Sequence, residues 1–263
     1  MRSVIDPRPA QDGSPTVLAI DTTAGLCSVA LLAGGACVRR AVPMTHGHSR
    51  HVLSLVDAVL RDAGVARSSI DAIGFGSGPG SFTGLRIACG VAQGLALGWD
   101  RPLVAVDAMR TLGLQACSPN RPVLVALDLR MGEACRAAFA AGAFDAGGWP
   151  EPLFGPLLGS PDLALEAFSA LADGPVRLAG DGFDAHPALG DWARAAGAAR
   201  ERPPDAVQPD AAAVARLAAL GLRAGRAIDA ALAAPLYLRD KVALDVGEQA
   251  ALRAARAAAT ERR

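Results

Sequence analysis

The sequence predicts an α/β protein built from two related lobes, and three observations support this prediction. A buried strand at residues 16–21 (TVLAID) ends in Asp21, and a second at 122–128 (PVLVALD) ends in Asp128. Each is followed by an apolar segment that is typical of a hairpin partner. A glycine-studded loop and helix at residues 74–98 lie within the first of these two units. The same strand and hairpin therefore occur in each half of the chain.

Composition narrows the class of protein. The chain has 263 residues, of which 51% are hydrophobic, with 26 basic and 26 acidic side chains. Balanced charge excludes a stand-alone nucleic-acid-binding protein, so we expect any contact with RNA only through a larger assembly. The five cysteines lack CxxC spacing, which indicates buried, reduced thiols in a cytoplasmic protein. No apolar run is long enough to predict a membrane span, and no membrane partner is expected.

The first lobe is expected to cover residues 16–118, after a disordered lead-in at 1–15. Turn residues at 22–25 and the Gly34–Gly35 pair predict a three-stranded meander. Ser49 is expected to cap a helix that ends at Gly64. The predicted elements are strands at 16–21, 26–32, 36–42, 70–76 and 102–106, and helices at 49–63, 81–98 and 108–116.

The second lobe is expected to cover residues 119–240, followed by an Ala/Arg tail at 241–263. Its strand at 122–128 is predicted to pair with a hairpin partner at 134–141. Apolar periodicity predicts the remaining elements. These are helices at 162–172, 184–196 and 209–225, and a strand at 176–179.

Glycines inside the helix at 81–98 require an explanation, because each costs a helix roughly 1 kcal/mol relative to alanine. Gly84, Ala88, Ala92 and Ala96 recur at every fourth position and form one smooth stripe, and Gly90, Gly94 and Gly98 form a second. A helix face that carries only small residues allows another backbone or helix to approach closely. The sequence therefore predicts close packing in the core, against a partner, or both.

Two interpretations fit the residues at the ends of the repeated strands. Asp21, Thr22 and Thr23 could cradle a phosphate through backbone amides and hydroxyls, with Asp128 acting from the opposite lobe. Ordinary turn chemistry explains the same residues, because Asp and Thr close hairpins through side-chain–backbone hydrogen bonds. The sequence leaves both interpretations open.

Other candidate sites are better explained by structural roles. Gly78–Ser81 precedes a helix but matches neither phosphate-loop nor dinucleotide spacing, so Ser81 is expected to cap the helix. Ser81 also lacks the G-x-S-x-G context of a hydrolase nucleophile. His46, His48 and His51 lie together at a helix start without neighbouring carboxylate or cysteine ligands. We therefore predict no metal site and no catalytic residue.

Four segments carry a resemblance to a known family. AIDTTAGLCSVALL, GSGPGSFTGLRIACGVAQGLALG, ALDLRMGEA and PLYLRD make the region from Thr16 to Asp240 similar to the TsaB (YeaZ) family. The resemblance implies a two-lobed actin-like ATPase (ASKHA, ribonuclease H-like) fold with a mixed sheet in each lobe. It also implies a role in making threonylcarbamoyladenosine beside the anticodon of ANN-reading tRNAs, as a non-catalytic heterodimer partner of TsaD, joined by the ATPase TsaE.

The resemblance also implies where partners bind. The helices at 49–63 and 81–98 are expected to pair with the equivalent helices of TsaD, or with a second copy of the chain when TsaD is absent. Arg86 is expected at the seam, where ATP or ADP could be held, and no other cofactor is implied. The expected interface residues are Leu53, Val56, Leu60, Phe82, Gly84, Leu85, Arg86, Ala88, Cys89 and Ala92.

An active enzyme is the alternative. An ATP-dependent phosphotransferase of the same fold would use Asp21, Thr22 and Asp128 in the cleft, with the Gly180–Gly182 turn near the adenine. A metallopeptidase of this fold would need two helical histidines after the strand at 102–106. The segment from Val106 to Thr111 contains none.

Overall fold

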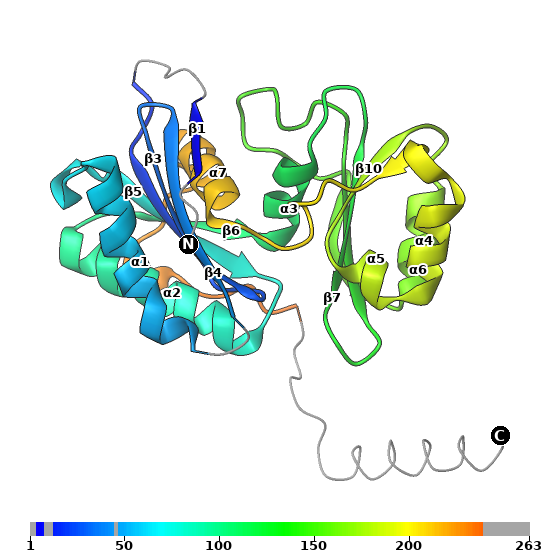
Figure 1. Cartoon of the computed structure of the whole chain (residues 1–263), viewed down its shortest axis with the longest axis horizontal. Coiled ribbons are helices and arrows are strands. Elements are labelled where there is room, and N and C mark those ends of the chain that lie inside the picture. Colours follow the sequence, from blue (N-terminus) through cyan, green and yellow to red (C-terminus); the bar gives the residue numbers. More distant parts are fainter. Residues whose placement is uncertain (1–3, 8–12, 45–46, 239–263) are drawn as a thin grey trace, which may run out of the picture.

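The computed structural model describes residues 4–7, 13–44 and 47–238. Two α/β lobes lie side by side, each with its own sheet (Figure 1). Within the described residues, no helix combines the length and apolar character that a membrane crossing requires.

The first sheet has the strand order β1-β4-β3-β2-β5-β6. Its strands are β1 (Val4–Pro7), β2 (Val17–Asp21), β3 (Leu26–Ala33), β4 (Ala36–Pro43), β5 (Ala72–Gly78) and β6 (Leu103–Asp107). The first three predicted strands form the expected antiparallel meander β2–β3–β4, and β5 and β6 continue the sheet parallel to β2. The lead-in is not wholly without structure, because β1 pairs with the edge of β4.

The second sheet repeats this topology, with the order β11-β10-β7-β8-β9. Its strands are β7 (Val123–Asp128), β8 (Ala134–Phe139), β9 (Phe154–Gly159), β10 (Val176–Ala179) and β11 (Arg200–Glu201). Here β7–β8–β9 is the antiparallel meander, and β10 and β11 are parallel to β7. The duplicated architecture and the mixed sheet in each lobe are confirmed. Strands β9 and β11 were not predicted from the sequence.

The described helices are α1 (His48–Ala63), α2 (Phe82–Trp99), α3 (Ala108–Ala116), α4 (Pro161–Ser169), α5 (Gly182–Ala185), α6 (Pro187–Ala195) and α7 (Ala211–Arg223). Helix α1 begins one residue earlier than predicted, with Gly47 rather than Ser49 as its N-cap, and ends at Gly64 as expected. The helix predicted at 184–196 is broken between α5 and α6. His186 is extended there because it precedes Pro187, which disfavours helical backbone.

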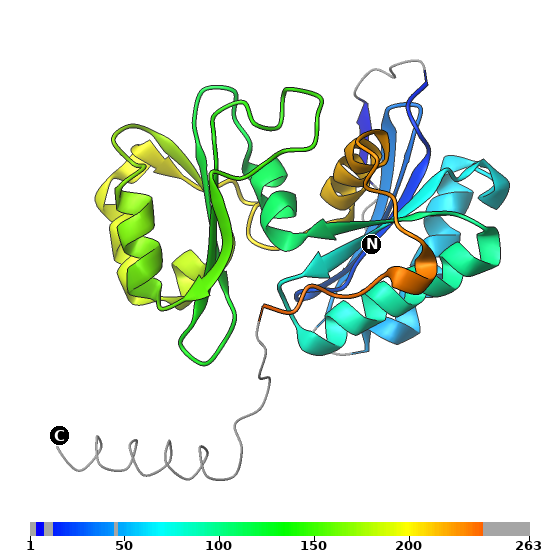
Figure 2. The same ribbon diagram turned by 180° about the vertical axis from the view of Figure 1, so that it is seen from behind.

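The last helix of each lobe is exchanged. Helix α3 follows the first sheet but packs its apolar side against β7 and β8 of the second. Helix α7 follows the second sheet and packs against β2, β3 and β6 of the first (Figure 2). Helices α1 and α2 cover the opposite face of the first sheet. Each lobe therefore completes its core with a helix from the other half of the chain.

The exchange corrects the predicted domain boundaries, because residues 211–237 lie with the first lobe, whereas Leu238 packs against the core of the second. Backbone hydrogen bonds join Leu103 and Ile228 in both directions, at 3.0 and 2.8 Å. The amide of Leu236 also donates to the carbonyl of Ser77 at 2.7 Å. Periodicity along the sequence could not reveal these long-range contacts.

Candidate functional site

The turn after β2 lies directly beneath the glycine-rich segment. The Ser81 amide donates to the Thr23 carbonyl at 2.7 Å, and the Thr22 hydroxyl donates to the Gly84 carbonyl at 2.7 Å. A Cβ on Gly84 would lie 2.0 Å from the Thr22 carbonyl oxygen, and one on Gly80 would lie 2.4 Å from that of Thr23. Glycine is required at positions 80 and 84, because the backbone there contacts the backbone of the turn after β2. This packing explains the stripe that contains Gly84.

Asp21 is the titratable group of this turn. One carboxylate oxygen accepts hydrogen bonds from the amide and the hydroxyl of Thr23, at 2.9 and 2.8 Å. The other is buried beside Gly76 and has no hydrogen-bond partner among the described residues. Burial raises the pKa of Asp21 from 3.8 to about 7, against the opposing effect of the Thr23 hydrogen bonds. Asp21 is therefore protonated in much of the population near neutral pH.

These contacts favour the turn interpretation over the phosphate interpretation for the first lobe. Asp21, Thr22 and Thr23 are 1%, 0% and 1% exposed. Their hydrogen-bonding groups serve the turn itself and helix α2. A phosphate has no access to them in this conformation, so their predicted role in nucleotide binding is corrected.

Asp128 lies at the matching position in the second lobe, with different neighbours. Its amide donates to the carboxylate of Asp181 at 2.9 Å, and its own carboxylate accepts from the amide of Arg130 at 2.9 Å. His186 lies nearby, with Nε2 3.5 Å from an Asp128 oxygen. Burial raises the pKa of Asp181, against the opposing effect of the hydrogen bond that its carboxylate accepts from the Asp128 amide. The turn after β7 is thus more polar than its counterpart after β2.

The surface of α1 and α2 differs from the predicted interface. Of the ten predicted residues, three are exposed, namely Leu53, Phe82 and Arg86. The other seven face the chain's own sheet and core, so the assignment of Val56, Leu60, Gly84, Leu85, Ala88, Cys89 and Ala92 to a partner interface is wrong for this conformation.

The exposed side of α2 carries the second glycine stripe. A Cβ on Gly90, Gly94 or Gly98 would meet nothing within 4 Å. Leu97 is 68% exposed on this helix, and Leu53 of α1 is 53% exposed. We name the set Leu53, Gly90, Gly94, Leu97 and Gly98 the outer face. Both stripes were visible in the sequence, but periodicity alone did not show which one faced the sheet.

Arg86 is part of an exposed aromatic cluster. Its guanidinium lies 3.8 Å from the ring centre of Phe82, and its Nε donates to the hydroxyl of Tyr237 at 3.2 Å. The rings of Phe82 and Tyr237 are 5.9 Å apart. Tyr237 was missed as a functional candidate because its place beside α2 depends on the return of the chain to the first lobe.

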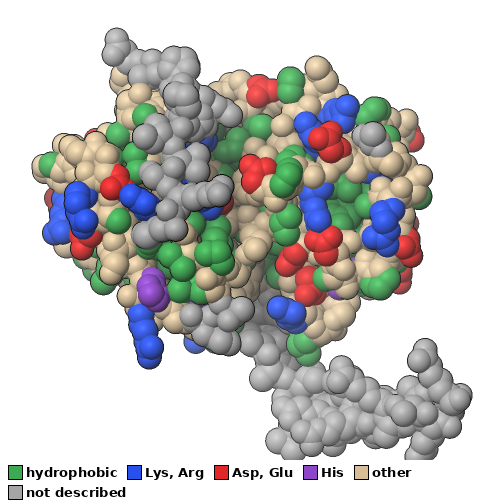
Figure 3. Space-filling model, viewed as in Figure 1, with side chains coloured by type: hydrophobic (Ala, Val, Ile, Leu, Met, Phe, Trp, Pro, Cys, Tyr) green, Lys and Arg blue, Asp and Glu red, His purple; other side chains and the backbone are tan. Residues whose placement is uncertain are grey.

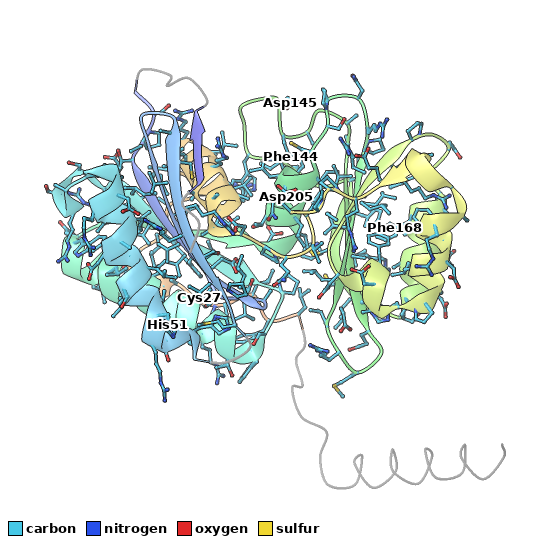
Figure 4. All side chains as sticks on the ribbon, in the orientation of Figure 1. Cys27, His51, Phe144, Asp145, Phe168 and Asp205 are labelled. Carbon is cyan, nitrogen blue, oxygen red and sulfur yellow. The ribbon has the colours of Figure 1, made fainter. Side chains whose placement is uncertain are left out.

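The remaining candidates have structural roles. Ser81 is the N-cap of α2 and accepts from the Gly84 amide at 3.4 Å. His48 is buried in the first turn of α1, His51 points outward (Figure 4), and His46 lies outside the described residues. Across the described parts of the chain, no group of three or more His, Cys, Asp or Glu side chains could hold a metal ion.

A pocket of about 530 Å³ lies between the lobes, bounded by β4, α3, α7 and the loop before α7. The charged residues Arg39 and Asp210 in its wall pair with each other. None of the predicted site residues lines it. Figure 3 shows basic and acidic side chains interspersed over both lobes on the face displayed.

Two sheets that share an order of five strands, joined by exchanged helices, define the duplicated ribonuclease H-like fold of the actin-like ATPases. The tRNA threonylcarbamoyladenosine biosynthesis protein TsaB of Escherichia coli is 33% identical over 229 residues, which cover 86% of this chain and 96% of that protein. The chain therefore belongs to the TsaB family.

Solved structures agree. YeaZ from Pseudomonas aeruginosa is 31% identical, with a TM-score of 0.70 over 85% of this chain and 100% of that one. A further structure, of an uncharacterized protein with similarity to peptidase YEAZ from Pseudomonas aeruginosa, has a TM-score of 0.71, 31% identity and coverage of 86% and 100%. The TsaD family, described as tRNA N6-adenosine threonylcarbamoyltransferase, matches residues 43–145. This match includes both α1 and α2.

Proposed function

We propose that this chain is the non-catalytic subunit that pairs with TsaD and supports transfer of threonylcarbamoyl to the adenosine beside the anticodon of ANN-reading tRNAs. The observation that carries the proposal is the turn after β2. In a phosphotransferase of this fold, that turn would have to receive a phosphate. Here Thr22 and Thr23 are buried, and their hydrogen bonds go to helix α2 and Asp21.

The outer face of α1 and α2 is the proposed TsaD-binding surface. Its glycines allow close approach of a partner helix, and Leu53 and Leu97 supply exposed apolar area. These glycines cost helix stability, and no atom of the described residues packs where their side chains would be. A helix of TsaD lying over them would provide that benefit. The matched TsaD segment is consistent with pairing between related helices.

Further contacts follow from this arrangement. Arg86, stacked on Phe82 beside the outer face, is proposed to reach the seam and any ATP or ADP held there. TsaE is proposed to join the pair. The balanced charge of the chain leaves most of the tRNA contact to the other subunits.

Co-purification with TsaD of the same organism, combined with Mg-ATP titration, tests the proposal. We expect a stable complex and no tight nucleotide binding by this chain alone. A phosphotransferase could use the polar turn at Asp128. It would also require the buried turn after β2 to open and receive a phosphate. Tight Mg-ATP binding by the isolated chain, without complex formation, would reject the scaffold role.

A further inference from the structure

A segment of the second lobe reaches back onto the first. Residues 140–153, here called the interlobe strap, connect β8 to β9. Phe144 of the strap packs against both the α3 cluster and the α7 cluster, and its position beside α3 is labelled in Figure 4. A Cβ on Gly113 of α3 would lie 2.6 Å from Cζ of Phe144. The missing side chain therefore provides the space that the phenyl ring occupies.

Trp149 anchors the other end of the strap in a second glycine-lined position. A Cβ on Gly221 of α7 would lie 2.9 Å from Cζ3 of the indole. Two guanidinium groups flank the ring: Arg110 of α3 at 5.3 Å and Arg226, beyond α7, at 4.9 Å from the ring centre. The indole is thus held by groups from both exchanged segments.

Glu151 forms ion pairs with the same two arginines. Its carboxylate oxygens lie 2.9 Å from Arg110 and 2.8 Å from Arg226. Arg110 also donates to the Pro150 carbonyl at 2.9 Å and pairs with Asp107 at 2.6 Å. Arg110 and Asp107 are only 14% and 10% exposed, so their ion pair is less screened by solvent than an ordinary surface pair.

We infer that the interlobe strap locks the two lobes at one angle, so that the chain moves as a single rigid body. Relative motion of two domains is expected unless the interface between them is extensive and apolar. Here a change of angle would have to withdraw Trp149 from Gly221 and separate Glu151 from at least one arginine. The inference rests on the strap contacts and is independent of the proposed function.

Spin-label distance measurements test the lock directly on the full chain. Labels on Ser54→Cys of α1 and Asp191→Cys of α6, both at exposed positions, report the interlobe distance in a Cys117→Ser background. The other four native cysteines are buried and should not label. We expect one narrow distance distribution for the parent and at least a twofold broader one for Trp149→Ala.

Trp192→Ala is the matched control. Trp192 also stacks on an arginine, Arg200 at 3.6 Å, but both residues lie within the second lobe, so its removal should leave the interlobe distribution narrow. Glu151→Gln, at a side chain that is 62% exposed, serves as a milder variant if Trp149→Ala does not fold, and it should broaden the distribution as well. A broad parent distribution, or an unchanged width in the folded strap variants, would overturn the lock.

Discussion

Asp21 places a carboxyl group in a site that favours its protonated form. One oxygen has two hydrogen bonds from Thr23, while the other is enclosed without a partner among the described residues. The pKa is about 7 in the folded chain, against an ordinary value of 3.8. Between pH 3.8 and about pH 7, Asp21 therefore takes up a proton when the chain folds. The contribution of Asp21 to stability is fully present below about pH 4 and is lost as the pH rises to about 7.

Replacing Asp21 with Asn should remove this pH dependence. The amide keeps an acceptor for Thr23 and cannot ionise, so the parent should lose stability from pH 5 to pH 8 while Asp21→Asn stays nearly constant. The difference at pH 8 is expected to be a few kcal/mol, since each pKa unit corresponds to about 1.4 kcal/mol. Thermal unfolding followed by circular dichroism across this range measures it. Asp57→Asn, at an exposed position on α1, should follow the parent curve; equal slopes for parent and Asp21→Asn would contradict the explanation.

Gly84 and Gly94 lie on the same helix and should respond oppositely to alanine. Gly84→Ala places a methyl group against the Thr22 carbonyl and should cost about 3 kcal/mol or more of unfolding free energy. Gly94→Ala meets only open space and should stabilise the isolated chain by up to about 1 kcal/mol. Urea unfolding of both variants provides the comparison. Similar effects of the same sign would mean that the two stripes are not distinguished by packing. Gly84→Leu should likewise impair folding, because any side chain at this position meets the Thr22 carbonyl.

Helix α2 shows what a pattern of small residues can and cannot predict. The sequence correctly predicts the helix, its Ser81 cap and its close packing, because these depend on local propensity and spacing. It does not determine which stripe faces the sheet, because both stripes are equally smooth. The decisive contact, between Gly84 and the turn after β2, joins segments about 60 residues apart. Seven of the ten predicted interface residues were therefore assigned to the wrong side of their helices.

The outer face of helices α1 and α2 can be tested by a single substitution. Leu97→Asp adds a charge to the proposed TsaD-binding surface without disturbing the core, because the side chain is 68% exposed. We expect at least tenfold weaker binding to TsaD, with the melting temperature of the isolated chain nearly unchanged. Isothermal titration measures the affinity. Leu157→Asp, on the exposed edge of the second lobe, is the control and should bind normally. Undiminished binding by Leu97→Asp would place the interface elsewhere.

The molecule as a whole is organised by the exchange of α3 and α7. Most strands and helices of each lobe could be predicted from alternation and helical periodicity, because each pattern lies within one segment. The exchange could not, since a helix with an apolar side does not indicate which sheet it will cover. The boundary placed at residue 118 followed chain order, whereas the structure assigns residues 211–237 to the first lobe.

Separated halves should therefore not fold independently. A fragment of residues 1–118 lacks α7, which leaves Val17, Ala30 and Val104 of the first sheet uncovered. We expect this fragment to aggregate or bind a hydrophobic dye, without a cooperative thermal transition. Linking residues 207–238 to its C-terminus should restore solubility and cooperativity. A cooperatively folding fragment 1–118 would show that α7 is dispensable for the first lobe.

Because α7 is exchanged, the first lobe cannot complete its core until most of the chain has been synthesised. The first sheet leaves the ribosome early, but the helix that covers its second face ends only at Arg223. Until that point the nascent chain exposes an apolar sheet face, a typical target for chaperones. A slow or paused ribosome would extend this exposure, so the yield of native protein should depend on how fast the second half is translated.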